Sequence, residues 1–239
     1  MRALFIQQDH VSPVGPLGER FEQRGYDVVE MGVVPEHRFH QPDVEVEFPD
    51  PTTFDVIVPM GAPWSVYDDQ TIGTWIDAEL AMLRQAHDAG VPVFGICFGG
   101  QSLAAALGGT VERAPVSEHG WMRIDTLAPD LIDDGPWFEY HSDRFTLPPG
   151  AQLLATSAHA PQAFRIGRSL GIQFHPETVA SMLQGWFDTG GREHFIHHGL
   201  DPDDVMAETL REEPAAIARG HRLVDRFLDV IATTPHPVG

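Results

Sequence analysis

The sequence predicts an α/β protein with a doubly wound, mostly parallel sheet flanked by helices. Through the first half of the chain, short apolar strands alternate with amphipathic helical stretches, and this order is typical of parallel sheets. Residues 110–173 differ, because their short strands are separated by Pro- and Gly-rich turns that predict antiparallel additions. We expect one domain over residues 1–190, with a helical C-terminal extension over 191–239 packed on it.

The expected parallel strands are short apolar segments bounded by turn residues. They cover residues 2–7, 26–31, 54–60 and 91–96. The segment 35–53 carries prolines and acids, so we expect it to cross the surface.

The expected helices connect these strands and show an apolar face at helical spacing. They cover residues 16–24, 71–89 and 99–107. Gly25 and Gly90 are stop signals for the first two helices, because glycine readily ends a helix.

The second half is expected to contain short strands followed by helices. The strands lie near Trp121, Phe138, Leu153, Phe164 and Ile172. The helices cover about 178–188, 203–211 and 214–231.

The charge balance limits the classes of partner. The formal net charge is −20, from 35 acidic and 15 basic residues. Such a surface repels nucleic acid and anionic lipid, so we expect neither as a partner. No apolar run is long enough for a membrane-spanning helix, and Met1 leads directly into a strand, so we expect a soluble cytoplasmic protein. The basic residues are all Arg, which excludes a catalytic or phosphate-binding Lys.

The single cysteine, Cys97, lies at a predicted strand-to-helix turn. The segment 95–99 reads Gly-Ile-Cys-Phe-Gly, the arrangement of a nucleophile elbow. A sharp turn lifts the sulfur above the sheet, the glycines relieve crowding, and the following helix directs its N-terminus at the sulfur. We interpret Cys97 as a nucleophile, although a lone Cys is also a common filler of the core.

A histidine and a carboxylate follow another short apolar strand. Residues 173–177 read Gln-Phe-His-Pro-Glu, so Glu177 lies two positions after His175. In extended backbone, residues two apart share a face, and Glu177 can therefore fix the tautomer of the His175 imidazole. The pair Pro176-Glu177 also suits the first turn of a helix, and both interpretations can hold together.

These motifs together resemble the class I, or triad, glutamine amidotransferases. The resemblance rests on Gly-Ile-Cys-Phe-Gly-Gly-Gln, on His175 placed 78 residues after Cys97, and on residues 60–66, Met-Gly-Ala-Pro-Trp-Ser-Val. The resemblance covers the chain from residue 2 to about 186. Within this family, the chain is similar to the free-standing type, which is related to the amidotransferase domain of GMP synthase and to γ-glutamyl peptidases. This resemblance implies a flavodoxin-like fold and no cofactor.

The resemblance also implies roles for individual residues. Cys97 would form a γ-glutamyl thioester, His175 would move the proton and Glu177 would orient His175. The oxyanion hole would consist of backbone N–H groups at three positions, Gly61, Ala62 and Phe98. Substrate would contact five further positions, Gln101, His119, Gly120, Gln173 and Phe174. Candidate specificity residues are His141 and Asp143, which are equally suited to stabilising a loop.

A histidine-rich stretch raises the question of a metal site. Residues 193–198 place His194 on one helical face with His197 or His198. The stretch follows Gly190-Gly191, and no Cys or carboxylate group supports it in sequence. We therefore expect a solvated polar segment and no metal.

Three functions stay open at this point. The chain can be an ammonia-generating subunit for a separate synthetase, since its sequence contains no P-loop pattern. It can be an autonomous hydrolase of other γ-glutamyl amides, or a non-catalytic binding module. The related cysteine-elbow proteases and chaperones fit less well, because they usually have His directly after the Cys, and this chain has Phe98.

Overall fold

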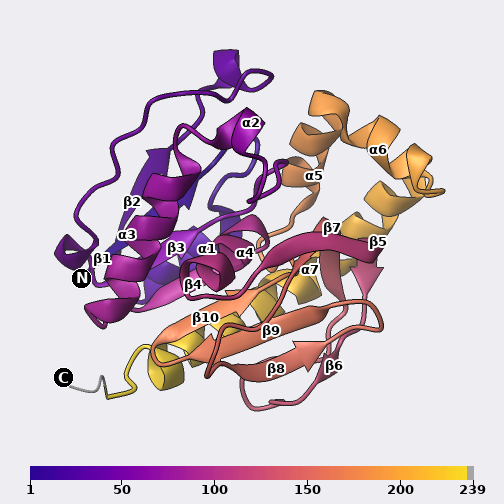
Figure 1. Ribbon diagram of the computed structural model, residues 1–239. Helices are drawn as coiled ribbons and strands as arrows, with labels where there is room; N and C mark the ends of the chain where they lie inside the picture. Colours follow the sequence, from indigo (N-terminus) through magenta and orange to yellow (C-terminus); the bar gives the residue numbers. More distant parts are fainter. Residues whose placement is uncertain (236–239) are drawn as a thin grey trace.

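The fold is organised around a mostly parallel, eight-stranded sheet (Figure 1). The computed structural model describes residues 1–235, so the last four residues of the predicted extension, 236–239, lie outside the described residues. Five strands pair in parallel in the order β2 (Asp27–Gly32), β1 (Arg2–Gln7), β3 (Val56–Pro59), β4 (Val93–Ile96) and β10 (Ser169–Ile172).

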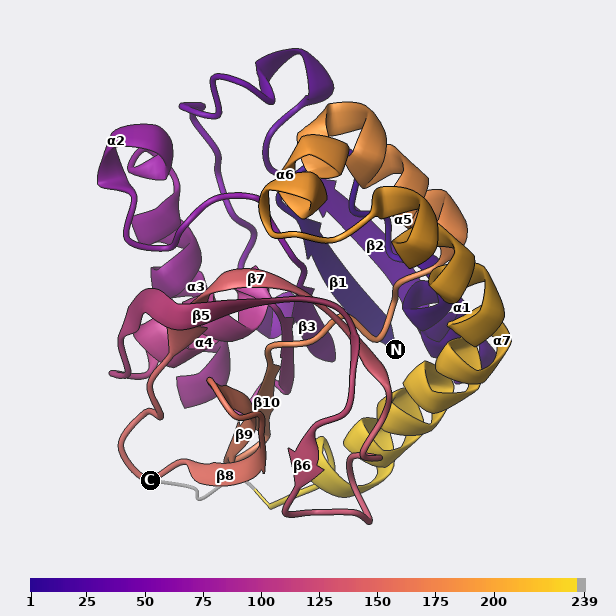
Figure 2. The same ribbon diagram turned by 90° about the vertical axis from the view of Figure 1, so that its right-hand side faces the viewer.

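Antiparallel strands extend one edge of this sheet. They follow β10 in the order β9 (Pro161–Ile166), β8 (Gln152–Thr156) and β6 (Asp125–Thr126). A separate antiparallel ribbon pairs β5 (Val111–Met122) with β7 (Trp137–Phe145) and runs toward the C-terminal helices (Figures 1 and 2). The predicted fold class, including the antiparallel additions, is confirmed.

Helices cover both faces of the parallel strands. On one face, α1 (Gly15–Gln23) and α7 (Pro202–Arg226) lie side by side (Figure 2), and the π-helical turn Phe227–Ile231 extends α7. Their apolar side chains share a core with alternate residues of β1, β3 and β4. The opposite face packs against α3 (Ile76–Asp88) and α4 (Phe98–Ala106).

The remaining helices are short. They are α2 (Asp69–Ile72), α5 (Ala180–Trp186), a π-helical turn (Phe187–Gly191), α6 (Arg192–His197) and two 3₁₀ turns, Glu36–Arg38 and Pro51–Thr53. Over residues 1–235, no helix has both the length and the apolar character needed to cross a membrane.

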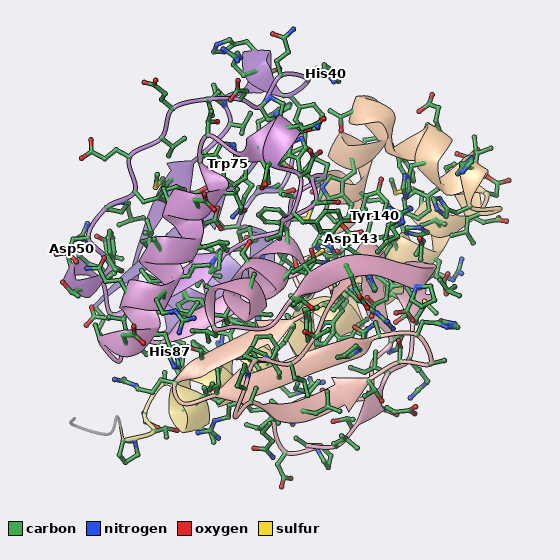
Figure 3. All side chains as sticks on the ribbon, in the orientation of Figure 1. His40, Asp50, Trp75, His87, Tyr140 and Asp143 are labelled. Carbon is green, nitrogen blue, oxygen red and sulfur yellow. The ribbon has the colours of Figure 1, made fainter. Side chains whose placement is uncertain are left out.

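The predicted single helix over residues 71–89 is wrong, because it is interrupted. The chain leaves α2 at Gly73, and α3 begins only at Ile76. Trp75, at the start of α3 (Figure 3), is fully buried, and its indole N–H donates to the Pro42 carbonyl at 3.0 Å. The interruption therefore lets one large side chain anchor the surface segment before β3.

The two helices predicted over 203–211 and 214–231 are instead one helix, α7, which continues through Pro214. Pro214 is exposed, so the backbone hydrogen bond that proline removes faces water. The buried face continues on both sides of it, through Val205, Ala216 and Leu223. Continuous packing outweighs the local break.

A buried carboxyl group on α3 makes stability depend on pH. Glu79 is fully buried and accepts a hydrogen bond from Gln8 Nε2 at 2.9 Å. Burial raises the Glu79 pKa to about 8, and the Gln8 hydrogen bond only partly opposes it. When protonated, Glu79 can donate to the Gln8 Oε1 atom, which has no hydrogen-bond partner within the part of the chain that the structure describes.

We expect Glu79→Gln to change the pH profile of unfolding. A raised folded pKa means that the folded state binds the proton more tightly, so wild-type stability is present below pH 4.5 and is lost as pH rises through about 8. The neutral amide removes this loss. The free energy of unfolding of wild type and of Glu79→Gln is measured by chemical unfolding at acidic and basic pH. The control is Asp77→Asn, an exposed position on the same helix. An equal dependence of the unfolding free energy on pH in all three proteins would contradict the prediction.

Candidate active site

Cys97 occupies a strained turn between β4 and α4. Its backbone has φ 48° and ψ −108°, the single positive φ of a non-glycine residue in the described chain, and such conformations cost about 1–3 kcal/mol. The helix packs directly on the strand: a Cβ on Gly95 would lie 2.5 Å from the Gly99 carbonyl oxygen, and one on Gly99 would lie 2.0 Å from the Pro59 carbonyl oxygen. The two flanking glycines are therefore required by close backbone contact.

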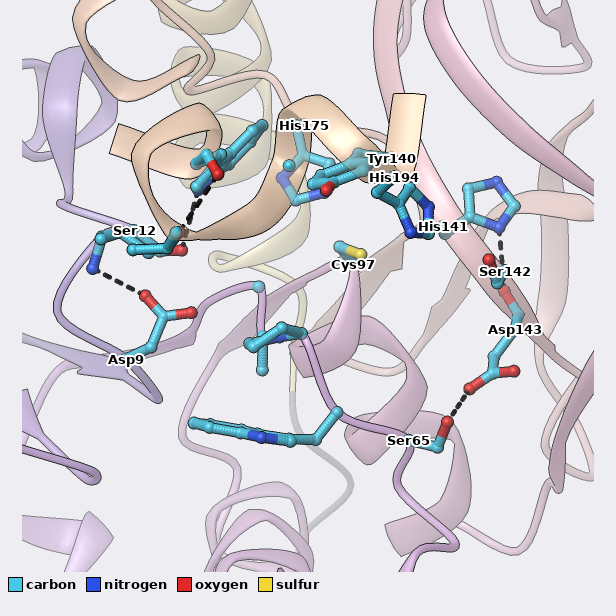
Figure 4. Close-up of a pocket in the computed structure, with 18 of the residues that line it drawn as sticks. Asp9, Ser12, Ser65, Cys97, Tyr140, His141, Ser142, Asp143, His175 and His194 are labelled. Atoms are coloured by element: carbon cyan, nitrogen blue, oxygen red, sulfur yellow. Dashed lines mark hydrogen bonds between the residues drawn. The ribbon is translucent and has the colours of Figure 1, made fainter. Parts of the chain in front are cut away.

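The Cys97 side chain borders a cavity of about 310 Å³ (Figure 4). Gly61 and Ala62 line the same cavity, from the turn after β3. The Gly99 N–H donates to the Met60 carbonyl at 2.9 Å, which holds this turn against the start of α4. Phe98 begins α4, and the first N–H groups of a helix have no intrahelical partner. The backbone positions predicted for an oxyanion hole thus come from two adjacent segments, the turn after β3 and the start of α4.

His175 and Glu177 form a buried pair on the cavity wall. His175 Nδ1 lies 2.8 Å from Glu177 Oε1, and both side chains are almost fully buried. His175 Nε2 has no hydrogen-bond partner among the described residues, so it is available to a substrate. Burial lowers the His175 pKa, but the electrostatic influence of Cys97 and of Glu177, with the Glu177 hydrogen bond, outweighs burial and raises the pKa well above its ordinary value. The Trp186 ring packs edge-to-face against His175, with the ring centroids 5.2 Å apart.

Two buried amides connect the sulfur to the cavity wall. Gln101 Nε2 donates to the Asp143 carbonyl at 3.1 Å and to Gln173 Oε1 at 3.2 Å. Gln173 Nε2 then approaches Cys97 Sγ at 3.7 Å. Gln101 lines the cavity, whereas Gln173 lies behind its wall.

Two other predicted substrate contacts do not reach the cavity wall. The Phe174 ring is fully buried and stacks on Trp137 at 4.5 Å. Gly120 has φ 89° and is buried in β5, opposite Glu139 of β7. The structure thus places Phe174 and Gly120 in the packing around the site.

A second imidazole, His141, lies between two buried carboxylates. Its Nε2 is 3.3 Å from both Glu118 and Glu139, and its Nδ1 donates to the Asp143 carbonyl at 2.9 Å. Burial lowers the His141 pKa, but the two carboxylates outweigh it and raise the pKa to about 10. His141 is therefore an imidazolium near neutral pH, and it places a positive charge beside the cavity.

The Asp143 carboxylate lies on the same side of the cavity as His141 and points toward Ser65 (Figure 4). It accepts hydrogen bonds from the Ser65 hydroxyl and from Tyr67 Oη, the latter at 3.0 Å. Arg113 lies 3.9 Å away and is mostly exposed. His141 and Asp143 are thus brought together at the cavity, as expected for neighbours on β7 that pair with β5.

Several lining residues were not identified from the sequence. They are Asp9, Ser12, Tyr140 and Trp186. Ser65 also lines the cavity, and it was visible in the sequence as part of the motif at residues 60–66. Asp9 and Ser12 come from the loop after β1, Tyr140 from β7 and Trp186 from α5, and only the fold brings these segments to Cys97.

His119 also lines the cavity, but its surroundings differ from those of His175. Burial lowers the His119 pKa to about 3, and the nearby imidazoles of His194 and His198 add to the effect. Neither ring nitrogen of His119 has a hydrogen-bond partner among residues 1–235, so no carboxylate orients it. His175 is therefore the better placed base. Within the histidine stretch expected to be solvated, His194 and His198 pack against His119, which corrects the prediction for these two residues, whereas His197 is exposed.

Comparison with known proteins identifies the family. Residues 25–185 match the family model described as glutamine amidotransferase class-I. A GMP synthase [glutamine-hydrolyzing] of Mycobacterium leprae is 34% identical over 185 residues, which is 70% of this chain and 32% of that protein. A GMP synthase of Xanthomonas oryzae pv. oryzae is 37% identical over 116 residues, 43% of this chain and 22% of its own length. The chain thus spans at most about a third of these relatives.

Solved structures show the same fold. A glutamine amidotransferase from Thermotoga maritima superposes with a TM-score of 0.81 at 22% identity, covering 96% of this chain and 98% of its own. A glutamine amido transferase from Methylobacillus flagellatus gives 0.81 at 24% identity, covering 100% and 98%. The family model spans more than half of the sequence and agrees with this fold, so the chain belongs to the glutamine amidotransferase class-I family.

Proposed function

We propose that the protein hydrolyses the γ-carboxamide of glutamine through a γ-glutamyl thioester on Cys97, releasing glutamate and ammonia. One observation carries this proposal. Cys97 and His175 border the same cavity, with His175 Nε2 unpartnered and His175 Nδ1 held by Glu177 at 2.8 Å. This is the arrangement of a nucleophile, a base and an orienting carboxylate.

The proposed first half of the reaction forms the thioester. The Cys97 sulfur attacks the carboxamide carbon, and the negative charge on oxygen is held by N–H groups of Phe98 and of the Gly61-Ala62 turn. The C–N bond then breaks, and the His175 imidazolium gives its proton to the departing ammonia. A raised His175 pKa supports this step, because the proton is present when ammonia leaves.

The proposed second half releases glutamate. Neutral His175 accepts a proton from water, and the resulting hydroxide attacks the thioester carbon. The C–S bond breaks, and the electron pair returns to the Cys97 sulfur. Glu177 keeps the Nδ1–H of His175 fixed through both halves, so that Nε2 always faces the reacting atoms.

For substrate recognition, we propose that Asp143 binds the α-ammonium group of glutamine. Its carboxylate lines the cavity and is already held by Ser65 and Tyr67. The predicted contact from Gln101 fits the same wall, because its amide donates to the Asp143 backbone. His141 would then act as a neighbouring charge that sets the local potential.

We further propose that the ammonia serves a separate synthetase. The matched relatives are named for both glutamine hydrolysis and GMP synthesis, and the match to the Mycobacterium leprae protein covers 32% of it. We propose residues 1–190 as the amidotransferase domain and 191–239 as an extension packed on it. Leu223, Val224 and Phe227 share a core with the sheet, which supports an extension packed on the domain. A catalytic thiol also favours a reducing compartment such as the cytoplasm.

A substrate panel tests the proposal. The purified protein is incubated with L-glutamine and with other γ-glutamyl amides and dipeptides, and released glutamate is measured. We expect slow turnover confined to glutamine, and labelling of Cys97 by a glutamine-analogue electrophile, located by mass spectrometry. Protein labelled beforehand is the control and should be inactive.

The other outcomes separate the alternatives. Fast turnover of γ-glutamyl compounds other than glutamine would replace the proposal with an autonomous hydrolase. No turnover and no labelling would indicate a non-catalytic binding module.

A further inference from the structure

Three histidines from distant parts of the chain converge beside the active-site cavity. His119 comes from β5, whereas His194 and His198 come from α6 and the residue that ends it. One ring nitrogen from each lies within 4.8 Å of the other two. The ring centroids are 4.3 Å apart for His119 and His198, 4.4 Å for His194 and His198, and 4.9 Å for His119 and His194.

The backbone explains how α6 presents two of these rings. Positions four apart on a helix lie one above the other, so His194 and His198 share the face that packs against His119. His197 lies between them in sequence, but it is exposed to solvent. The pair therefore faces the protein, and His197 does not.

The ring nitrogens are free in the way that metal ligands require. Both nitrogens of His119 are buried and have no hydrogen-bond partner among residues 1–235. His198 Nδ1 lies 2.8 Å from the His194 carbonyl oxygen, to which it donates, so its Nε2 carries the lone pair. Metal-binding histidines commonly use one nitrogen for the metal and donate the other to a backbone carbonyl. Unpaired buried nitrogens otherwise cost free energy, and an ion would satisfy one of the two on His119.

We propose that His119, His194 and His198 bind a divalent transition-metal ion of the Zn²⁺ class, which clamps α6 to β5 at the wall of the active-site cavity. Three imidazoles suit Zn²⁺, Cu²⁺ or Ni²⁺ and not Mg²⁺ or Ca²⁺, which prefer oxygen ligands. A tetrahedral zinc site separates its nitrogens by roughly 3.4 Å, so binding draws the three rings about an ångström closer. Water can complete the fourth position, as in open three-histidine sites.

The position of this site matters for the cavity. His119 and His194 line the same cavity as Cys97 and Tyr140. His194 also packs edge-to-face on Tyr140 with centroids 5.2 Å apart, and Figure 4 shows the two side chains together on the side of Cys97 where His141 lies. The ion would thus fix one wall of the cavity by joining strand β5 to helix α6.

Zinc binding to tag-free protein tests this site independently of enzymatic activity. Calorimetry with ZnCl₂ measures the affinity and stoichiometry, and Co²⁺ absorption in the visible range reports tetrahedral coordination. We expect one ion per chain in wild type and at least roughly tenfold weaker binding in His198→Ala. His197→Ala is the matched control, since it removes an exposed neighbouring imidazole and should bind as wild type does.

Two further proteins keep the result interpretable. Cys97→Ser excludes the catalytic thiol as the ligand and should retain the site. His194→Gln is the second variant if melting shows that metal-free His198→Ala does not fold, and it should also bind at least roughly tenfold more weakly. Absence of binding in wild type, or binding that persists in His198→Ala or disappears in Cys97→Ser, would overturn the proposal. None of these outcomes depends on turnover of glutamine, so the proposed hydrolysis is tested separately.

Discussion

Replacing Cys97 with Ser is expected to reduce the rate of glutamine hydrolysis by at least about 10⁴-fold, because enzymes that lose their nucleophile keep only residual catalysis from binding and the oxyanion hole. A serine hydroxyl is far less nucleophilic than a thiolate, and a serine at this position would no longer raise the His175 pKa as the Cys97 sulfur does. The rate of glutamate release measures the loss. Labelling by the electrophile should disappear in parallel.

The same variant separates catalysis from packing. Cys97 is buried, and Ser is smaller by little, so the positive φ and the surrounding contacts are retained. We therefore expect circular dichroism and the melting temperature to stay close to wild type. An unfolded Cys97→Ser protein would show that the side chain is needed for the core, and retained turnover would show that another group is the nucleophile.

Local sequence patterns predicted most of the fold, but not the helix boundaries that depend on tertiary contacts. The strand at residues 2–7 was predicted with its observed bounds, because its apolar run and the following turn are local features. The break between α2 and α3 depends on Trp75 reaching the Pro42 carbonyl, a contact across the chain. The continuity of α7 through Pro214 likewise depends on packing, which local breaker rules do not include.

The same distinction applies to the site. Cys97 directly follows β4 and His175 lies three residues after β10, each within a recognisable motif, so the sequence could point to both. The imidazolium of His141 depends on the register that places Glu118 opposite it on β5, and register is not visible in one strand alone. His119 and His194 are 75 residues apart, and only the folding of α6 onto β5 brings them together.

Gly61→Ala is expected to lower kcat by about 10²-fold, because misplacing a catalytic group by about an ångström can cost that much. A Cβ at Gly61 would lie 2.8 Å from His175 Cε1, closer than real Cβ atoms approach. The imidazole cannot simply retreat, since Glu177 holds Nδ1 and the Trp186 ring packs against it. The ring must therefore tilt, and Nε2 then loses its alignment with the substrate.

Steady-state kinetics on glutamine distinguish this tilt from general damage. A displaced base lowers kcat more than it changes KM, because binding of the substrate does not need the proton transfer. Gly32→Ala is the control, because a Cβ there has no atom within 4 Å and should leave both constants unchanged. Labelling of Cys97 should slow in Gly61→Ala but still occur, because the sulfur is retained and the added Cβ lies 3.8 Å from Cys97 Cβ. Wild-type kcat in Gly61→Ala would mean that the turn moves to make room, and His175 would then not be fixed by this contact.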